Sequence, residues 1–359
     1  MGRFVSSLCA LLFLLGIAPR ILAGQSIPAA AKPILVKVVV VAMFERGDDT
    51  GDAPGEYQLW VEREHLDQVF DLPAAYHHVR MNKDGVLAML TGVGTAKAAS
   101  SVMALGLDPR FDLSKAYWIV AGIGGGDPAD VSLASGVWAD HVIDSDLAYE
   151  IDPREIPKDW PTGYLPLRRS TPYQQPVPTG ADAEEYTLNS QLVGWALQIT
   201  KDVRLVDSDA IRASRSRWNG FPNAQRPPFV TRGDSLSGST FWHGILLDEW
   251  ANQWVKYFTG GQGNYMICGM EDTGTLQSLT LLNAAHRIDI NRVLVLRTVS
   301  NYDRQAPGLT AAESLQQMNS GRYAAYMEAL ETAERVGDKV VRDIVSNWSE
   351  REQTVPSVK

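Results

Sequence analysis

The sequence predicts an α/β protein in which a central mixed sheet is flanked by helices. Short runs rich in β-branched residues alternate with longer segments whose apolar residues recur at helical spacing. This alternation is typical of α/β folds. The chain has 359 residues, of which 45% are hydrophobic and 21% charged, so it can bury a large core.

Five segments have the composition of strands, namely residues 34–43, 86–90, 116–121, 137–143 and 292–299. Six segments have helical periodicity, namely residues 57–70, 95–105, 188–200, 241–258, 273–287 and 322–346. The apolar stripe of the last segment predicts core packing. Residues 152–180 contain seven prolines and no clean periodicity. We expect a long surface excursion there, which is either a passive insertion or a lid over a pocket.

The N-terminus predicts export. Arg3 precedes an apolar run at residues 4–18, and small residues follow near Ala23, so residues 1–23 have the pattern of a secretory signal. The alternative, an uncleaved anchor, needs about 20 apolar residues to span a bilayer, and the run is shorter. We therefore expect a linker at 24–32, one domain at 33–347, a tail at 348–359 and a secreted or periplasmic protein without a membrane span.

Charge and residue usage narrow the class of ligand. The net charge of −9 argues against a nucleic-acid surface, which would need basic residues to neutralise phosphates. The six histidines form no His-x-x-x-His or His-Glu-x-x-His pattern, so no metal site is predicted. Without the signal only Cys268 remains, which excludes an intramolecular disulfide. A small, neutral ligand fits this composition best.

Two glycine-rich segments mark the predicted binding region. Residues 91–95 lie between a predicted strand and a helix, where glycine lets the backbone approach a ligand and the helix start attracts an anion or a hydroxyl. A tight turn without a ligand is the alternative. Residues 121–128 end another strand, and ligands of open α/β sheets bind at such carboxyl edges. Together the two segments predict a binding crevice.

The tetrapeptide at residues 233–236 reads Gly-Asp-Ser-Leu and matches the nucleophile block of the GDSL esterases. Such a serine needs a histidine base oriented by an aspartate. The sequence has no Asp-x-x-His motif, so serine hydrolysis is a minor alternative. His243 lies near this segment and is the one histidine that we consider a candidate for a functional role.

The most informative residues stand at a helix start and a strand end. Asp272 suits the role of an N-terminal helix cap, but capping leaves the neighbouring Glu271 unexplained. The late predicted strand leads into Asn301 and Asp303, which are polar residues at a strand end.

In combination these motifs resemble the nucleoside phosphorylase superfamily, and the whole mature chain more closely resembles the purine nucleoside permease family of fungi and bacteria. The matching segments are residues 117–128, 233–244, 250–252, 270–275 and 297–303. The resemblance implies a three-layer nucleoside phosphorylase-like fold, a purine nucleoside as ligand and no cofactor, with inorganic phosphate as a candidate co-substrate. It also implies a homo-oligomer, as in relatives.

The resemblance also implies roles for single residues. Glu271 would accept hydrogen bonds from the ribose hydroxyls, Met270 would pack beneath the sugar, and Asn301 would hydrogen-bond the purine N7. The other implied site residues are Gly122, Gly124 and Gly125 beside the base, Thr91, Gly92 and Glu45 on the side of the nucleophile, and Ser235 and Ser237 on the substrate side.

Asn301 departs from the aspartate that most bacterial relatives carry. Asparagine donates a hydrogen bond but transfers no proton, so the acid role passes to Asp303, or the reaction is restricted to 6-oxopurines, or turnover is slow. The enzyme hypothesis is cleavage of the N-glycosidic bond by hydrolysis or phosphorolysis. Its rival is a non-catalytic nucleoside-binding component of uptake. No arginine is assigned to phosphate, because Arg297 lies in a strand and residues 212–217 are expected to form a solvated face.

Overall fold

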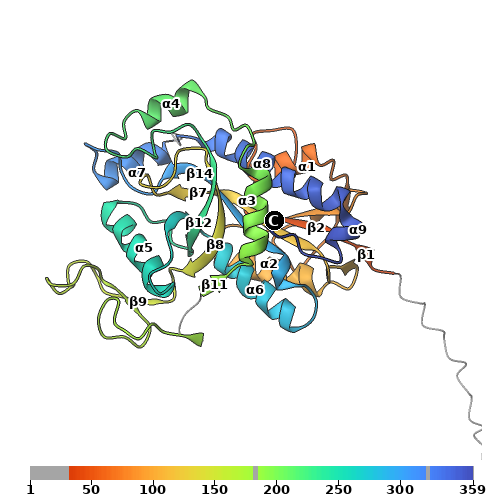
Figure 1. Ribbon diagram of the computed structural model, residues 1–359, viewed down its shortest axis with the longest axis horizontal. Helices are drawn as coiled ribbons and strands as arrows, with labels where there is room; N and C mark the ends of the chain where they lie inside the picture. The colour runs from red at the N-terminus through yellow and green to blue at the C-terminus, as the bar shows by residue number, and fades with distance from the viewer. Residues whose placement is uncertain (1–31, 181–184, 321–323, 359) are drawn as a thin grey trace, which may run out of the picture. The chain divides into compact units, whose positions relative to one another are not determined.

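The computed structural model describes residues 32–180, 185–320 and 324–358. A compact unit runs from Pro33 to Lys359, and Figure 1 follows its path from the orange strands to the blue C-terminal helices. The expected signal at residues 1–23 and all but the last residue of the expected linker lie outside the described residues.

A ten-stranded mixed sheet forms the centre of this unit. In sheet order its strands are β11 (Glu185–Thr187), β8 (Gly136–Asp144), β12 (Val230–Ser237), β13 (Tyr265–Gly269), β7 (Tyr117–Gly126), β2 (Val38–Ala42), β5 (Val86–Leu90), β4 (Val79–Met81) and β3 (Gln68–Phe70). The remaining strand, β14 (Val293–Tyr302), pairs in parallel with β7 and antiparallel with β8. The pairings therefore form a closed ring of five strands, in the order β7, β14, β8, β12 and β13. This ring brings the ends of β7, β13 and β14 together.

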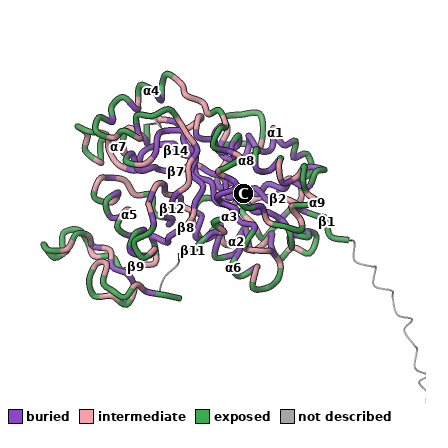
Figure 2. The backbone as a smooth tube through the Cα atoms, viewed as in Figure 1, coloured by how far each residue is buried: buried purple, intermediate pink, exposed green. Residues whose placement is uncertain are grey.

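The central strands are buried along their whole length. Every residue of β2 and β14 is buried, and β5 is equally covered. Strands that are buried on both faces read as continuous apolar runs rather than as an alternation, which is why β-branched composition located them in the sequence. Figure 2 shows the same pattern, with buried strands in the middle and exposed residues on the outer helices.

The helices cover this sheet. Their bounds are α1 (Gln58–Arg63), α2 (Thr95–Leu107), α3 (Ser190–Thr200), α4 (Asp209–Arg215), α5 (Ile245–Phe258), α6 (Asp272–Ala284), α7 (Ala311–Asn319), α8 (Tyr326–Ser346) and α9 (Trp348–Arg351). Helix α8 packs on β14 and β7, α2 packs against α6, and α5 lies on β12 and β13. Val336, Val340 and Ile344 of α8 are fully buried, which confirms this part of the predicted core stripe, whereas Met327 is 43% exposed and Tyr323 lies outside the described residues.

Two local expectations are wrong. The strand expected at residues 116–121 continues to Gly126, so most of the second glycine-rich segment forms the end of β7. Glycine is required there, because a Cβ on Gly124 would lie 2.1 Å from the carbonyl oxygen of Cys268 in the neighbouring strand. The helix expected at residues 57–70 ends at Arg63, and His65 then adopts a left-handed φ of 51° before β3 begins.

The proline-rich excursion is mostly irregular. Its strand β10 (Tyr164–Pro166) pairs with β9 (Ala148–Glu150), which lies just before the excursion. Elsewhere, a further two-stranded sheet joins β1 (Ile34–Leu35) to β6 (Phe111–Asp112). The ring of Tyr173 packs near Trp254 and Tyr257 of α5, with centroid distances of 6.5 and 6.0 Å. In the part of the chain that the structure describes, no helix is both long and apolar enough to cross a membrane.

Candidate functional site

A cavity of about 570 Å³ opens where the ends of β7, β13 and β14 meet the start of α6. This volume is typical of a pocket for a small molecule. Six residues that the sequence singled out contribute to its lining, namely Gly124, Gly125, Met270, Glu271, Asn301 and Asp303. Three separate strands and a helix start therefore deliver these residues to one place.

Other sequence candidates lie outside this lining. Thr91 is fully buried, and its hydroxyl donates to the carbonyl of Gly92 at 3.1 Å. Gly92 has a φ of 80° and packs against the ring of Tyr76, while the next residue, Val93, reaches the cavity. The first glycine-rich segment thus borders the cavity through a neighbour of the predicted residues.

Gly122, Ser235 and Ser237 lie beneath the cavity. A Cβ on Gly122 would stand 2.6 Å from the Glu56 carboxylate, so glycine is needed for this close approach. Ser237 is fully buried, and its Oγ accepts the backbone N–H of Thr273 at 3.3 Å. These residues support the walls of the cavity rather than face into it.

Glu45 has a local structural task. Its carboxylate accepts the backbone N–H groups of Gly55, Tyr57 and Gln58, the last two at 3.1 and 2.6 Å. These donors lie at the start of α1, where N–H groups lack partners within the helix. Glu45 therefore caps α1, and its side chain is not part of the cavity lining.

Glu56 lines the cavity, although sequence reasoning missed it. It is almost fully buried and accepts the backbone N–H groups of Met43 and Ile123 at 2.8 and 2.7 Å. Burial raises the pKa of Glu56 to about 8, against the opposing effect of Arg297 and with the help of Glu271. A loop separates Glu56 from β2, and the only sequence signal for it is its place just before α1.

Buried Arg297 organises the wall next to Glu271. Its Nη2 donates to Glu271 Oε2 at 2.9 Å and to Asp272 Oδ1 at 2.6 Å, and its Nη1 donates to the carbonyl of Ile123 at 3.0 Å. Asp272 is fully buried in this contact. The expected cap by Asp272 is not observed, since no side-chain cap bond is present at the start of α6.

Glu271 is held from a second direction as well. The backbone N–H of Gly94 donates to Glu271 Oε1 at 3.1 Å, which joins the start of α2 to the start of α6. A carboxylate that is fixed by a buried arginine and a backbone amide loses little conformational freedom when it binds a ligand.

The opposite end of the cavity holds Asn301 and Asp303. Asn301 Nδ2 donates to the carbonyl of Tyr302 at 3.0 Å, and its Oδ1 accepts from Ser300 Oγ at 2.9 Å. Asp303 Oδ2 accepts the hydroxyl of Tyr265 at 2.5 Å. Asn301 therefore has hydrogen-bond partners among its own neighbours in the chain.

The carboxyl of Asp303 is surrounded by other acids. Burial, followed by the charges of Asp248 and Asp127, raises the pKa of Asp303 well above its ordinary value. Burial also raises the pKa of Asp248 to about 6, although Arg304 donates to it at 2.7 Å. Burial and the neighbouring acids thus favour the protonated form of Asp303, in which the carboxyl can donate a hydrogen bond or a proton.

The Gly-Asp-Ser-Leu segment lies within β12 and forms no serine-hydrolase triad. Ser235 is fully buried and donates to Asp272 Oδ2 at 3.3 Å. The nearby histidine, His141, pairs with Asp234 at 2.7 Å. His243 contacts Ser314 at 3.0 Å, and burial lowers its pKa to about 4. Serine hydrolysis has no support in this geometry.

The arginines at residues 212–217 do not form a uniformly solvated face. Arg215 is buried and bridges Asp207 at 2.6 Å. Arg217 lines a second cavity of about 280 Å³, which shares Asn301 and Met318 with the first. No described residue of the 152–180 excursion lines either cavity, so the lid alternative gains no support.

Solved nucleosidase structures share this fold. The Streptococcus pneumoniae MTA/SAH nucleosidase in complex with 8-aminoadenine matches with a TM-score of 0.51 and 16% identity, over 86% of this chain and 99% of that one. The futalosine hydrolase of Helicobacter pylori strain 26695 matches with a TM-score of 0.52 and 12% identity, over 86% and 98%. The protein therefore has the three-layer nucleoside phosphorylase-like fold that the sequence predicted.

The family follows from sequence. Residues 35–356 match the family described as Purine nucleoside permease (NUP). A probable purine nucleoside permease of Schizosaccharomyces pombe is 31% identical over 289 residues, which are 78% of this chain and 82% of that protein. A purine nucleoside permease of Candida albicans is 30% identical over 267 residues, 73% of this chain and 64% of that longer protein. The chain belongs to the purine nucleoside permease family, as its motifs indicated.

Proposed function

We propose that this protein binds a purine nucleoside in the larger cavity and cleaves its N-glycosidic bond by attack of water. One observation carries the proposal: the cavity places three carboxyl groups in three unlike environments. Glu271 pairs with Arg297, burial raises the pKa of Glu56 to about 8, and burial together with neighbouring acids raises the pKa of Asp303 well above its ordinary value. Acids whose pKa values are driven apart by their surroundings are the usual basis for separate catalytic roles in one site.

Glu271 suits the ribose. Glycosidic cleavage passes through a state in which the sugar carries positive charge. A fixed carboxylate that accepts hydrogen bonds from the 2′- and 3′-hydroxyls stabilises this charge as it develops. Met270 precedes Glu271 in the lining and supplies an apolar surface beneath the sugar.

Glu56 is suited to activate the attacking water as a general base. A general base is most effective when its pKa lies near the working pH, and the pKa of Glu56 is about 8. Its carboxyl reaches the same cavity as Glu271, and the charges of the two acids influence each other. Glu56 thereby takes the nucleophile-side role that the resemblance assigned to Glu45.

Asp303 and Asn301 are placed to assist the departure of the purine base. A departing purine needs a proton or a strong hydrogen-bond donor on its imidazole nitrogen. Asn301 supplies an amide donor after giving up its bond to Tyr302, and Asp303 supplies the proton. This arrangement makes Asp303, rather than Asn301, the acid of the reaction.

Hydrolysis fits the charges of the cavity better than phosphorolysis. Arg297 is committed to Glu271 and Asp272, so its charge is already compensated. A phosphate dianion near Glu271 would meet like charge. Arg46 also lines the cavity, with its guanidinium over the ring of Tyr326 at 5.5 Å, and is the arginine that phosphorolysis would have to use. Water meets no such penalty.

A second candidate function is a non-catalytic nucleoside-binding component of uptake, and Asn301 is the observation that favours it. The amide holds a base but cannot protonate it, and the relatives described above are named permeases. In that case Glu271 and Asn301 would retain the nucleoside, and the proton on Asp303 would serve only to avoid a buried charge.

Export by removal of residues 1–23 belongs to the same proposal. N-terminal sequencing of the protein recovered from outside the cytoplasm should begin at Gly24. Recovery of the intact N-terminus from the cytoplasm alone would contradict export.

The proposed reaction is tested by incubating the protein with inosine, guanosine and adenosine, with and without phosphate, and measuring free base by chromatography. We expect base release that is independent of phosphate. Binding without release, measured by calorimetry, would support the second candidate. Release only with phosphate would contradict hydrolysis.

A matched pair of variants tests the ribose assignment. Glu271→Gln should lower kcat/KM by about 10²–10³, the usual effect of removing one charge-stabilising partner. Glu249→Gln changes the same side chain at an exposed position on α5 and should leave kcat/KM unaltered. A loss of only a few fold in Glu271→Gln would show that this carboxylate does not hold the sugar.

A further inference from the structure

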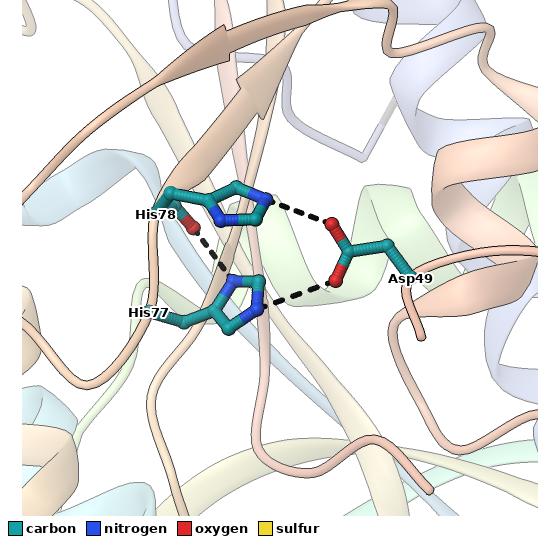
Figure 3. A group of neighbouring side chains, drawn as sticks. All are labelled: Asp49, His77 and His78. Atoms are coloured by element: carbon teal, nitrogen blue, oxygen red, sulfur yellow. Dashed lines mark hydrogen bonds and ion pairs between the residues drawn. The ribbon is translucent and has the colours of Figure 1, made fainter. Parts of the chain in front are cut away.

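Asp49, His77 and His78 form a compact cluster outside the cavity lining. Asp49 lies in the loop after β2, and the two histidines directly precede β4. His77 Nε2 lies 3.3 Å from Asp49 Oδ1, and His78 Nε2 lies 2.8 Å from Asp49 Oδ2. Figure 3 shows both imidazole rings directing a nitrogen at the same carboxylate. Two chain segments thus converge on one set of potential ligand atoms.

His77 makes an unusual contact with the carboxylate of Asp49. Its Nδ1 lies 3.0 Å from the carbonyl oxygen of His78, which can only accept, so Nδ1 carries the hydrogen. A neutral imidazole has one N–H, and Nε2 of neutral His77 therefore presents a lone pair to a carboxylate oxygen. This contact is favourable only with a cation on or near Nε2, which is either a second proton or a metal ion.

We propose that this cluster is a binding site for a divalent transition-metal ion of the zinc type, held by Nε2 of both histidines and Oδ1 of Asp49, with water as the fourth ligand. Two ligands placed 2.0–2.1 Å from a tetrahedral ion are roughly 3.3 Å apart, which matches the His77–Asp49 separation. One potential ligand atom from each of the three residues lies within 4.8 Å of the other two. The site is independent of the proposed nucleoside reaction.

The surroundings of His77 are those of a metal-bound histidine. Ligand histidines usually donate their other ring N–H to a carbonyl or a carboxylate, which fixes the ring and its tautomer. The bond from His77 Nδ1 to the His78 carbonyl has this role. The edge of the ring also packs against Tyr57, at a centroid distance of 5.8 Å. The donor nitrogen is therefore preorganised.

Asp49 is equally well placed as a ligand. Its side chain is 9% exposed, and Arg80 Nε donates to Oδ2 at 2.5 Å, which leaves Oδ1 for the ion. Burial raises the pKa of Asp49, but the bonds from Arg80 and His78 outweigh it and hold this pKa below its usual value. The charge of Arg80 opposes a divalent ion, so we expect weaker binding than at a zinc site with four protein ligands.

Binding requires a rearrangement of protons. His78 must carry its hydrogen on Nδ1 so that Nε2 is free to bind the ion. The bound ion would tie the loop after β2 to β4, and this loop also carries Arg46 and Glu56 of the cavity lining.

The test uses the full chain without a polyhistidine tag, stripped with a chelator and titrated with ZnCl₂ in a calorimeter. We expect saturable binding of one Zn²⁺ per chain, confirmed by elemental analysis after dialysis, and no comparable binding of Mg²⁺ or Ca²⁺, because imidazole ligands favour transition metals. Absence of saturable Zn²⁺ binding, or equal binding of Ca²⁺, would overturn the proposal.

Three variants locate the site. His77→Asn keeps a donor near the Nδ1 position but removes Nε2, and Asp49→Asn removes the anionic ligand; each should weaken Zn²⁺ binding by at least about 100-fold. His286→Asn makes the same change at an exposed position with a φ of 58°, which asparagine tolerates, and should bind normally. Unchanged affinity in His77→Asn would place the ion elsewhere and refute the site.

Co²⁺ provides a readout that does not depend on folded variants. Wild-type protein loaded with Co²⁺ should show the intense visible bands of a four-coordinate ion, and added Zn²⁺ should remove them. A spectrum identical to that of aqueous Co²⁺ would contradict the proposal even if the variants fail to fold.

Discussion

The two ends of the cavity contain similar acidic side chains that have different neighbours. At one end Glu271 and Asp272 share the buried guanidinium of Arg297, at 2.9 and 2.6 Å. At the other end Asp303 contacts the hydroxyl of Tyr265 at 2.5 Å and senses the charge of Asp248. At the first end a cation compensates the acids, whereas at the second end burial and neighbouring acids raise the pKa of Asp303 and favour its protonated form.

This difference teaches how one cavity can offer both hydrogen-bond acceptors and a proton donor. A buried charge is costly unless it is paired, and an unpaired acid becomes neutral instead. Glu271 is thereby prepared to accept from hydroxyl groups, and Asp303 is prepared to donate. The contrast arises from neighbours and not from the acids themselves.

The largest expected effect comes from removing the cation. Arg297→Met leaves Glu271 and Asp272 as uncompensated buried acids and should lower the free energy of unfolding by about 3–5 kcal/mol. Urea denaturation measures this change. Arg335→Met removes a half-exposed pair with Glu331 and should cost less than about 1 kcal/mol. Similar losses of stability in both variants would show that Arg297 does not compensate the buried acids in the way described.

The next effect tests the proton at the other end. Asp303→Asn replaces the buried acid with a neutral amide of the same shape as its protonated form, which the raised pKa favours, so stability should change little. The kcat should fall about 10²–10⁴-fold if Asp303 protonates the base. Steady-state kinetics and urea denaturation separate the two readouts. Asp209→Asn, at a fully exposed position, is the matched control. Retention of full kcat in Asp303→Asn would remove the acid role.

The reverse substitution sharpens the same point. Asn301→Asp introduces an acid at the position where the resemblance implies an aspartate in most bacterial relatives, and it should raise kcat if protonation of the base limits turnover. Single-turnover base release measures this effect. A fall in kcat without a change in KM would indicate that the amide itself is needed for the reaction.

A smaller effect appears in the pH dependence of stability. The folded pKa of Glu56, about 8, exceeds its ordinary value of 4.5, so folding retains a proton that the unfolded chain releases in this interval. Its contribution is complete below pH 4.5 and is lost as the pH rises to about 8. The slope is about 1.4 kcal/mol per pH unit for one proton.

Denaturation curves of wild type and Glu56→Gln between pH 5 and pH 8 test this sign. The stability of wild type relative to the variant should decline as the pH rises. Asp303 contributes in the same direction, so a residual slope should remain in the variant. Parallel curves would show that Glu56 titrates normally in the folded protein.

The smallest effect concerns Ser235. Ser235→Ala removes one hydrogen bond to Asp272 and should lower the free energy of unfolding by about 1 kcal/mol without altering kcat. Chromatographic assay of base release checks the second expectation. Loss of all activity would revive the role of a nucleophile for this serine.

Local patterns predicted much of the fold and part of the site. The apolar runs located β2, β5 and β14, and helical periodicity located α2 and α8 within a few residues. Met270, Glu271 and Asn301 were found because they stand where a helix starts or a strand ends. The boundary of α1 and the extension of β7 were missed, since tertiary contacts overrode local propensity there.

Glu56, by contrast, had no local pattern that set it apart. Its carboxyl reaches the cavity because the loop after β2 returns it to the backbone of Met43 and Ile123. The cluster of Asp49, His77 and His78 was equally invisible, because its ligands come from two loops and form no recognised spacing.

The sequence by itself determined the α/β class, the family and the identity of the residues at the strand and helix ends, because periodicity and motif spacing are local properties. Only the tertiary structure decided the protonation of those residues and their partners. The charge states of Glu56 and Asp303 depend on burial and on neighbours such as Arg297 and Asp248. These neighbours are distant in the chain and come close only in the folded sheet. The two ends of the cavity differ for that reason alone.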